Sequence, residues 1–375
     1  MFQELEKQNY TNVKGIFAGI DYSISLRSLL TGNNPGHIFV DNLTHPRTVF
    51  ALTVDGYFLA GEYNDPLIRS ELSQFLQGQI FTGKIFTGTD FWMMLAIHPA
   101  EWETYLPEII PTHEAEKVHR YHYTCDHVAF DGRAALPEGF QAYPLVDILS
   151  GAVKAEIPED LEGEVTISAM WGSVEKYLRQ GMGIAIVHDR QVVTICRAVC
   201  ATKDVLEIGI DTLPAFRHRG LAAAATVAAV EQALAHGYRE VSWQCDYDNI
   251  GSWKTAKKAG FTRVHEYDFF DYIFDVGDQL AQLAYRAYMN NDYKRCIEYY
   301  QKAFPLQQEK QPSDYFFIAA AYANQSDKAN TLRYLQEAAR IGWHSVERTM
   351  KTPVFSFLFG TKEWEDVISK IRGNA

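Results

Sequence analysis

One short segment in the middle of the chain, residues 207–222, limits most strongly what this sequence can fold into. It is typical of a strand, a basic turn and an alanine-rich helix, which we expect to run from 221 to 236. A helix N-terminus presents backbone N–H groups without partners inside the helix, and the helix dipole places partial positive charge there. Arg217 and Arg219 add two fixed cations, and Gly220 lets the backbone approach a ligand closely. The segment therefore predicts an anion site, and a pyrophosphate fits it well.

This segment resembles the acetyl-coenzyme A loop of the GNAT-type N-acetyltransferases, whose pattern is Arg/Gln-x-x-Gly-x-Gly/Ala. The six matching residues are Arg217, His218, Arg219, Gly220, Leu221 and Ala222, and a family-type proline, Pro214, precedes them. A second family signature follows in the expected order, as Asn249-Ile-Gly-Ser252, a helix and Gly260-Phe261. The two ordered signatures favour this resemblance over the alternative, a helix entered through an ordinary basic turn.

The resemblance implies which residues bind acetyl-CoA. In the family the pantetheine arm of the cofactor pairs with the strand before the loop, and that strand ends here at Ile210, Asp211 and Thr212. We expect the loop residues to hold the diphosphate, with His218 as a donor on the phosphate side. Asn249 and Ser252 are expected to contact the cofactor arm. No metal ion is implied.

Glu207 lies at the start of this strand, where several family members carry a general base. A carboxylate there would take the proton of an attacking amine, directly or through water. With period-two alternation Glu207, Gly209 and Asp211 share one face, so we expect Glu207 and Asp211 to form an acidic pair that selects a cation. Burial of the two like charges would raise one pKa toward a useful value. The alternative is that Glu207 is a solvent-facing carboxylate.

The sequence departs from the family where a proton donor is expected, because many members place a tyrosine where this chain has Ala256. Ser252, Tyr247 or a water are the alternatives for protonating the leaving thiolate, which can also leave unaided since thiols have a pKa of about 8.5. We interpret Cys245 as a core thiol rather than a nucleophile. The run 119–127 contains three histidines and a cysteine. Strand alternation separates these possible ligands, so we predict a strand there and no metal site.

Composition and periodicity divide the chain into four segments. Residues 1–135 alternate β-prone runs with helices, as in half of a GNAT fold, but lack the loop, so we expect a degenerate domain without cofactor. Residues 136–163 are rich in proline, glycine and acidic residues and are expected to form a connector. Residues 164–275 hold both signatures and are expected to form the catalytic domain. Residues 277–375 resemble a helical domain of tetratricopeptide (TPR) type.

The expected elements follow from period and turn signals. In the first segment we expect strands at 37–41, 48–54, 57–60 and 91–97, a two-residue turn at Asp55-Gly56, and helices at 65–77, ended by Gly78, and 100–108. In the catalytic segment we expect a helix at 169–180 and strands at 183–188, 191–200, 205–211, 240–247 and 269–274. In the tail, Leu283 and Ile318 are 35 residues apart (318 − 283), close to the TPR period of about 34. The predicted fold is α/β (α+β): tandem GNAT-like domains, the first degenerate, then a TPR-like tail.

The formal net charge of −12 argues against non-specific nucleic-acid binding, which needs a basic surface. It is compatible with attraction of a cationic small molecule, and the alternative is that the acidity only keeps the protein soluble. No apolar run approaches the roughly 18 residues needed to span a membrane, and the N-terminus does not resemble a signal peptide. Five scattered cysteines are interpreted as reduced thiols, so we expect a cytoplasmic protein.

A finer resemblance is to the zwittermicin A resistance acetyltransferases, whose relatives include the edeine and paenilamicin self-resistance enzymes. The residues that carry it are Met170-Trp171-Gly-Ser, Leu178-Arg-Gln-Gly-Met-Gly183, Glu207-Ile-Gly-Ile-Asp-Thr212, Trp243-Gln-Cys245 and Ser252. It implies acetylation of a primary amine on a cationic peptide or aminopolyol antibiotic, by direct attack of the amine on the thioester. Two alternatives stay open: an enzyme that acetylates a protein or peptide amine held by the tail, and a non-enzymatic acetyl-CoA sensor. The sequence leaves the antibiotic, the acetylated nitrogen and the oligomeric state open.

Overall fold

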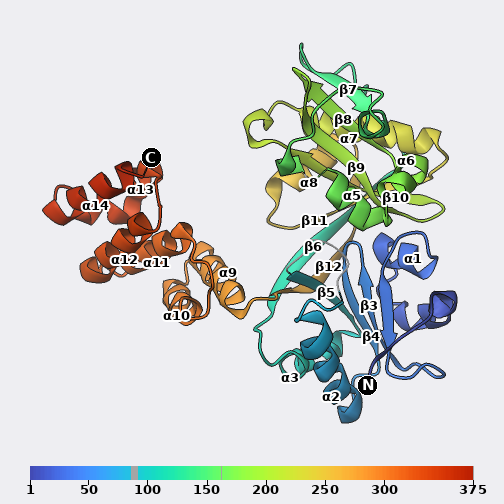
Figure 1. Cartoon of the computed structure of the whole chain (residues 1–375), viewed down its shortest axis with the longest axis horizontal. Coiled ribbons are helices and arrows are strands. Elements are labelled where there is room, and N and C mark those ends of the chain that lie inside the picture. The colour runs from blue at the N-terminus through green and yellow to red at the C-terminus, as the bar shows by residue number, and fades with distance from the viewer. Residues whose placement is uncertain (86–91, 162, 375) are drawn as a thin grey trace. The chain divides into compact units, whose positions relative to one another are not determined.

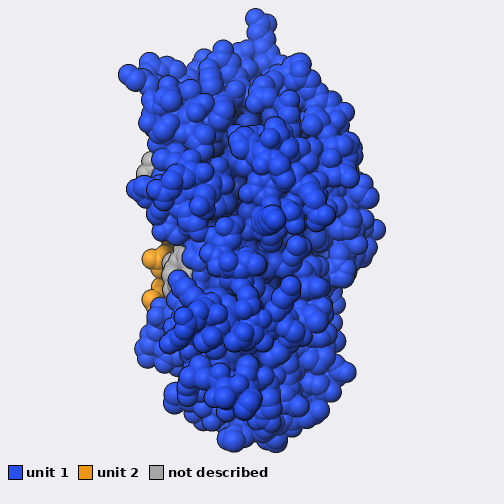
Figure 2. Space-filling model, turned by 90° about the vertical axis from the view of Figure 1, so that its right-hand side faces the viewer, with its two compact units in different colours: residues 1–111, 117–271 blue, residues 112–116, 272–375 orange. Residues whose placement is uncertain are grey.

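The computed structural model describes residues 1–85, 92–161 and 163–374 (Figure 1). The first residue of the expected strand 91–97, residue 162 of the expected connector and residue 375 of the tail lie outside the described residues. Two compact units are present (Figure 2): residues 1–111 with 117–271, and residues 112–116 with 272–375.

A single sheet runs through the first unit. Among the described residues it has twelve strands in the order β1-β2-β3-β4-β5-β12-β6-β11-β10-β9-β8-β7. The strands are β1 (Gln3–Glu4), β2 (His37–Val40), β3 (Thr48–Thr53), β4 (Gly56–Gly61), β5 (Trp92–His98), β6 (Glu116–Cys125), β7 (Gln141–Pro144), β8 (Gly183–His188), β9 (Gln191–Ala201), β10 (Val205–Thr212), β11 (Glu240–Asp246) and β12 (Thr262–Ile273).

The two halves of this sheet repeat one arrangement. In the first half β2, β3 and β4 form an antiparallel meander, and β5 pairs parallel to β4. In the second half β8, β9 and β10 form the meander, and β11 pairs parallel to β10. Each parallel pair is joined through a helix, α2 (Pro66–Phe75) in the first half and α7 (Leu221–Ala235) in the second. The tandem α/β arrangement expected from the sequence is therefore present.

The halves exchange strands at the centre of the sheet. Strand β12, from the end of the second half, lies between β5 and β6. Strand β6 contains residues 119–125 of the histidine-rich run, and it pairs antiparallel with β11, with Cys125 opposite Val241. The predicted domain boundary at residue 135 places β6 in the first domain. In the structure, β6 pairs with a strand of the second domain.

Several local elements differ from the sequence prediction. The tight turn between β3 and β4 consists of Val54 and Asp55, and Gly56 already pairs with Thr53 as a strand residue. The shift by one residue has a local cause, because the Thr53 hydroxyl accepts the Asp55 N–H at 3.2 Å and donates to the Gly56 carbonyl at 2.9 Å. Gly78 does not end the first long helix, since α2 continues into a π-helical turn (Leu76–Ile80).

The helices expected at 169–180 and 100–108 are each divided. The first consists of α5 (Glu164–Trp171) and α6 (Val174–Gln180), because Gly172 is left-handed (φ 83°) and Ser173 caps α6 by accepting the Lys176 N–H. The second is a 3-10 helix (Ala100–Tyr105) followed by α3 (Leu106–Ile109). The expected connector also contributes regular structure, since it contains β7, paired with β8, and α4 (Leu145–Leu149). Helix α1 (Ile24–Leu30) and a 3-10 helix (Lys7–Phe17) precede β2.

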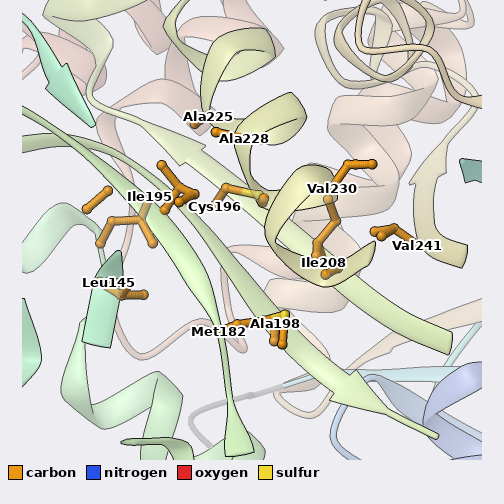
Figure 3. Close-up of a cluster of buried hydrophobic side chains, with 14 of the residues drawn as sticks. Leu145, Met182, Ile195, Cys196, Ala198, Ile208, Ala225, Ala228, Val230 and Val241 are labelled. Atoms are coloured by element: carbon orange, nitrogen blue, oxygen red, sulfur yellow. The ribbon is translucent and has the colours of Figure 1, made fainter. Parts of the chain in front are cut away.

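The main core of the second half packs α7 against the sheet (Figure 3). Ala225 and Ala228 of α7 are buried, as are Ile195 on β9 and Ile208 on β10. Because alanine side chains are short, the helix lies close to the strands it covers. This packing fixes the two elements that flank the basic turn, namely the end of β10 and the start of α7.

The second unit is helical. Its helices are α9 (Val276–Met289), α10 (Tyr293–Ala303), α11 (Pro312–Asn324), α12 (Lys328–Arg340), α13 (Val346–Lys351) and α14 (Lys362–Arg372). Helices α9 and α10 pack together, as do α11 and α12. The second helices of these pairs start 35 residues apart (328 − 293). Assignment to the TPR class stays a prediction. No helix in the described part of the chain is long and apolar enough to cross a bilayer.

Candidate active site

The basic turn lies between a strand and a helix, as the sequence predicts. Gly220 is the N-cap residue of α7 with φ 80°, a left-handed conformation that favours glycine. His218 is also left-handed (φ 62°), and Arg217 holds the turn by donating from Nε to the Thr212 carbonyl at 3.1 Å. Within the described residues no side chain caps α7. Its first N–H groups are therefore available to a ligand.

A cleft of about 840 Å³ lies in front of this helix start. It is lined by the end of β10, the basic turn, the first residues of α7 and the first turns of α8 (Ile250–Lys258). Of the residues expected to bind the cofactor, it brings together Ile210, Asp211, Thr212, Arg217, His218, Gly220, Leu221, Ala222, Asn249 and Ser252. Arg219 is not among the residues that line the cleft, and its guanidinium lies 5.4 Å from the centre of the Phe216 ring.

Helix α8 adds cations to the cleft that the sequence analysis missed. Lys254 and Lys258 both line it. Their spacing of four residues puts them on one face of a helix, so a helical pattern from 250 onward would have identified them. Asn249 caps α8, because its Oδ1 accepts the Ser252 N–H at 3.1 Å. The Ser252 hydroxyl accepts the Trp243 indole N–H at 3.0 Å.

Glu207 is buried, with 3% of its surface exposed. It is therefore not the solvent-facing carboxylate of the alternative prediction. Nor does it pair with Asp211, so the predicted acidic pair was wrong. A register shift between Glu207 and Ile208 interrupts the alternation of β10, and Asp211 forms an ion pair of 2.8 Å with Arg197 on β9.

The neighbours of Glu207 come from distant parts of the chain. Gln244 on β11 donates from Nε2 to both carboxylate oxygens, at 2.8 Å each, and Ser242 donates at 3.3 Å. The Tyr267 hydroxyl on β12 donates to Oε1 of Gln244 and so fixes its orientation. Asp55, from the turn between β3 and β4, contacts the Glu207 carboxyl by a hydrogen bond.

Burial, together with the neighbouring Asp55, raises the pKa of Glu207 to about 8. The hydrogen bonds from Gln244 and the charge of Arg120 oppose this shift. Arg120 lies on β6, with an Nε to Asp246 Oδ1 distance of 3.2 Å. A carboxyl with this pKa can exchange a proton near neutral pH, as a general base must.

The other residues considered as catalytic or metal-ligating candidates lie in different environments. Tyr247 follows β11, is about half exposed, and lies outside the set of residues that line the cleft. Ala256 is fully buried in the core, and Cys245 is a buried thiol whose pKa is raised by burial. His119 contacts Asp268 and Glu266 at 2.8 and 3.0 Å. Over the described ranges no group of three or more His, Cys, Asp or Glu side chains is arranged so that it could hold a metal ion.

A family model and three known proteins are similar to this chain. A family model described as GNAT acetyltransferase matches residues 14–270. An uncharacterized N-acetyltransferase, YdfB of Bacillus subtilis (strain 168), is 26% identical over 277 residues, covering 72% of this chain and 98% of that protein. A GCN5-related N-acetyltransferase-like protein from Streptococcus suis is similar in structure (TM-score 0.50, 22% identity, 71% of this chain and 99% of that one). A tandem GNAT protein from the clavulanic acid biosynthesis pathway has a TM-score of 0.47 at 11% identity, covering 73% of this chain and 98% of that one.

The chain belongs to the GNAT acetyltransferase family. It is an N-acetyltransferase with two GNAT-like halves and a helical C-terminal region. Enzymes of this family use acetyl-CoA as the acetyl donor.

Proposed function

We propose that this enzyme acetylates a primary amine of a small cationic antibiotic, a peptide or an aminopolyol, and thereby inactivates it. The resemblance to the zwittermicin A resistance enzymes supports this substrate class. So does the net charge of −12, because an acidic protein attracts polyamines. The five cysteines are free and buried, in keeping with a reaction in the cytoplasm.

One observation carries the acetyl-donor part of the proposal: an uncapped helix start opens on a large cationic cleft. The N–H groups at the start of α7, Arg217, and the two lysines of α8 supply donors and positive charge for a diphosphate. The cleft is also long enough along β10 to include Ile210, Asp211 and Thr212, which would pair with the pantetheine arm.

In this proposal Glu207 acts as the general base. The ionised carboxyl takes a proton from the acceptor ammonium through a water molecule, because Glu207 is buried and lies outside the cleft lining. The amine nitrogen bonds to the thioester carbon, and the carbon–sulfur bond breaks. The leaving thiolate receives a proton from Ser252, Tyr247 or water, or leaves without one. Ser252 is the better placed of the two side chains because it lines the cleft and Tyr247 does not. Backbone donors near the carbonyl stabilise the developing oxyanion.

Two measurements test this proposal together. Calorimetric titration with acetyl-CoA should give saturable binding to the folded protein, and no heat would contradict the assignment of the cleft. Incubation with acetyl-CoA and a panel of polyamine-containing peptide and aminopolyol antibiotics, followed by mass spectrometry, should give a mass increase of one acetyl group for at least one compound. Binding of acetyl-CoA without turnover on any amine would favour the sensor alternative instead.

A second candidate substrate, a protein or peptide amine held by the tail, is favoured by one observation. The second unit has a hollow of about 460 Å³ whose lining includes Asp278, Asp314 and Phe317. Acidic and aromatic groups together suit a basic peptide segment. A pull-down from cell extract that needs residues 277–375, with acetylation of the captured protein, would favour this candidate over the antibiotic.

A further inference from the structure

The hairpin between β3 and β4 carries an acidic side chain into the site of the second half. Asp55 is the second residue of its two-residue turn and is half-buried. The Thr53 hydroxyl bonds both sides of this turn, so the backbone fixes where Asp55 lies. Asp55 contacts Glu207 even though 152 positions separate them (207 − 55).

Most other groups around Glu207 keep one protonation state near neutral pH. Burial raises the pKa of Tyr267 and of Cys200 on β9, so both stay neutral. Burial lowers the pKa of His122 on β6 to about 4, so this imidazole, linked to Glu207 through Ser242, is also neutral. The surrounding acidic groups raise the pKa of Arg120, so its guanidinium stays charged. Of these groups Glu207 is left to exchange a proton near neutral pH.

A small hollow beside Asp55 argues against a separate ligand site there. It measures about 20 Å³ and is lined by Asp55, Arg120, Gln244 and Tyr267, among others. A volume of this size holds about one water molecule and no substrate group. Asp55 therefore acts on the reaction through Glu207 rather than by touching substrate.

We propose that Asp55 and Glu207 share a single proton, and that Asp55 is a positioning residue of the acetyl-transfer site. Two carboxylates in contact cannot both ionise easily, because each raises the energy of the other's charged form. Gln244 and Arg120 stabilise the one negative charge that remains. The inference rests on the proposed role of Glu207 as the base, and it gives the loop-less first half a part in the chemistry of the second.

The proton balance follows directly. At lower pH the pair holds one proton and cannot accept another from an ammonium group. When that proton leaves to solvent, the doubly ionised pair takes one proton from the acceptor ammonium, and the neutral amine attacks the thioester. Turnover is then limited on the acid side by the loss of the shared proton, near pH 8.

The direct test is an NMR titration of the full chain labelled with 13C at the glutamate side-chain carboxyls. The Glu207 resonance is assigned by its absence in Glu207→Gln. We expect it to titrate near pH 8 in the wild type, and at least about one pH unit lower in Asp55→Asn, because the like charge is gone. The matched control is Asp189→Asn, since the Asp189 side chain is 91% exposed and lies in the turn between β8 and β9. An unchanged midpoint in Asp55→Asn would overturn the proposal.

Kinetics provide the second readout. In Asp55→Asn the acid limb of the pH profile of kcat/KM should move to lower pH by the same amount as the NMR midpoint. The affinity for acetyl-CoA should stay unchanged. A uniform loss of activity with no shift would indicate a merely structural role and contradict the proposal. If Asp55→Asn fails to fold, Asp55→Ser replaces it in both measurements. If the wild type acetylates no amine at all, the proposed function fails, whereas the titration still decides whether the two carboxyls share a proton.

Discussion

Both halves of the sheet contain the same crossover, a strand followed by a helix and a parallel strand. The two crossover helices differ in how they begin. In the first half, β4 leads into α2 and then into the parallel strand β5. The start of α2 is capped by Asp65, whose Oδ1 accepts the Leu67 N–H at 2.9 Å and whose Oδ2 pairs with Arg47 at 3.2 Å. In the second half, β10 leads into α7, which begins at Gly220 with no side-chain cap among the described residues.

The start of a crossover helix can bind an anion when no side chain caps it. A carboxylate at the N-cap occupies the free N–H groups and neutralises the positive end of the helix dipole. The same N–H groups without a cap, beside arginine and lysine side chains, are left for a diphosphate. The first half has instead kept a carboxylate on its hairpin, Asp55, which reaches Glu207.

The largest expected effect comes from Glu207 in the second half, compared with a glutamate that follows strand β4 in the first half. Glu207→Gln should lower kcat by about 100- to 1,000-fold, because a general base typically contributes 10²–10⁴-fold. Acetyl-CoA affinity should be spared, since Glu207 lies outside the lining of the cleft. The control is Glu62→Gln, just beyond β4 in the first half, which should keep full activity. Equal turnover in Glu207→Gln would remove it as the base.

The next effect tests the uncapped helix start. Gly220→Val should weaken acetyl-CoA binding by about 100-fold, because a β-branched residue is strained by roughly 1–3 kcal/mol at positive φ and its side chain crowds the phosphates. Gly237→Val is the matched control, since Gly237 has φ 92° just beyond the other end of α7. Calorimetry should give similar losses of stability for both variants and a loss of affinity for Gly220→Val alone. Equal affinities would mean that the helix start does not bind the cofactor.

A smaller effect concerns the cations found only in the structure. The double substitution Lys254→Met and Lys258→Met should weaken acetyl-CoA binding by about 10-fold at low salt, and by less at high salt, because exposed charge pairs contribute up to about 1 kcal/mol each. Lys257→Met is the control on the same helix, since its Nζ lies 4.8 Å from the centre of the Trp253 ring and it does not line the cleft. Equal loss in the control would point to a general charge effect.

The smallest effect tests the capped helix start. Asp65→Ala should lower the free energy of unfolding by about 1 kcal/mol, the usual contribution of an N-cap side chain. It should leave acetyl-CoA binding to the protein at one site, because Arg47, the partner of Asp65, does not replace the cleft that Arg217, Lys254 and Lys258 line in the second half. Urea unfolding measures the first result, and the calorimetric stoichiometry measures the second. A second binding site in this variant would show that the Asp65 cap alone prevents the first half from binding acetyl-CoA.

The sequence predicted the strand–turn–helix unit of the cleft well because its determinants are contiguous. Strand β10, the left-handed Gly220 and helix α7 lie within one or two residues of their predicted positions. Predictions that relied on a single glycine were weaker: Gly56 proved to be a strand residue, and Gly78 lies inside a π-helical turn. In both cases hydrogen bonds made by neighbouring residues decided the backbone path.

The sequence was sufficient to predict the strand, the basic turn and the helix start that we propose as the acetyl-donor site, because their determinants are contiguous along the chain. What only the tertiary structure decided is the environment of Glu207. Its partners Asp55, Gln244 and Tyr267 come from three separate strands or turns, and a register shift in β10 separates it from Asp211. No local pattern encodes such a set, since burial and pairing across the sheet determine both the contacts and the proton affinity of the carboxyl.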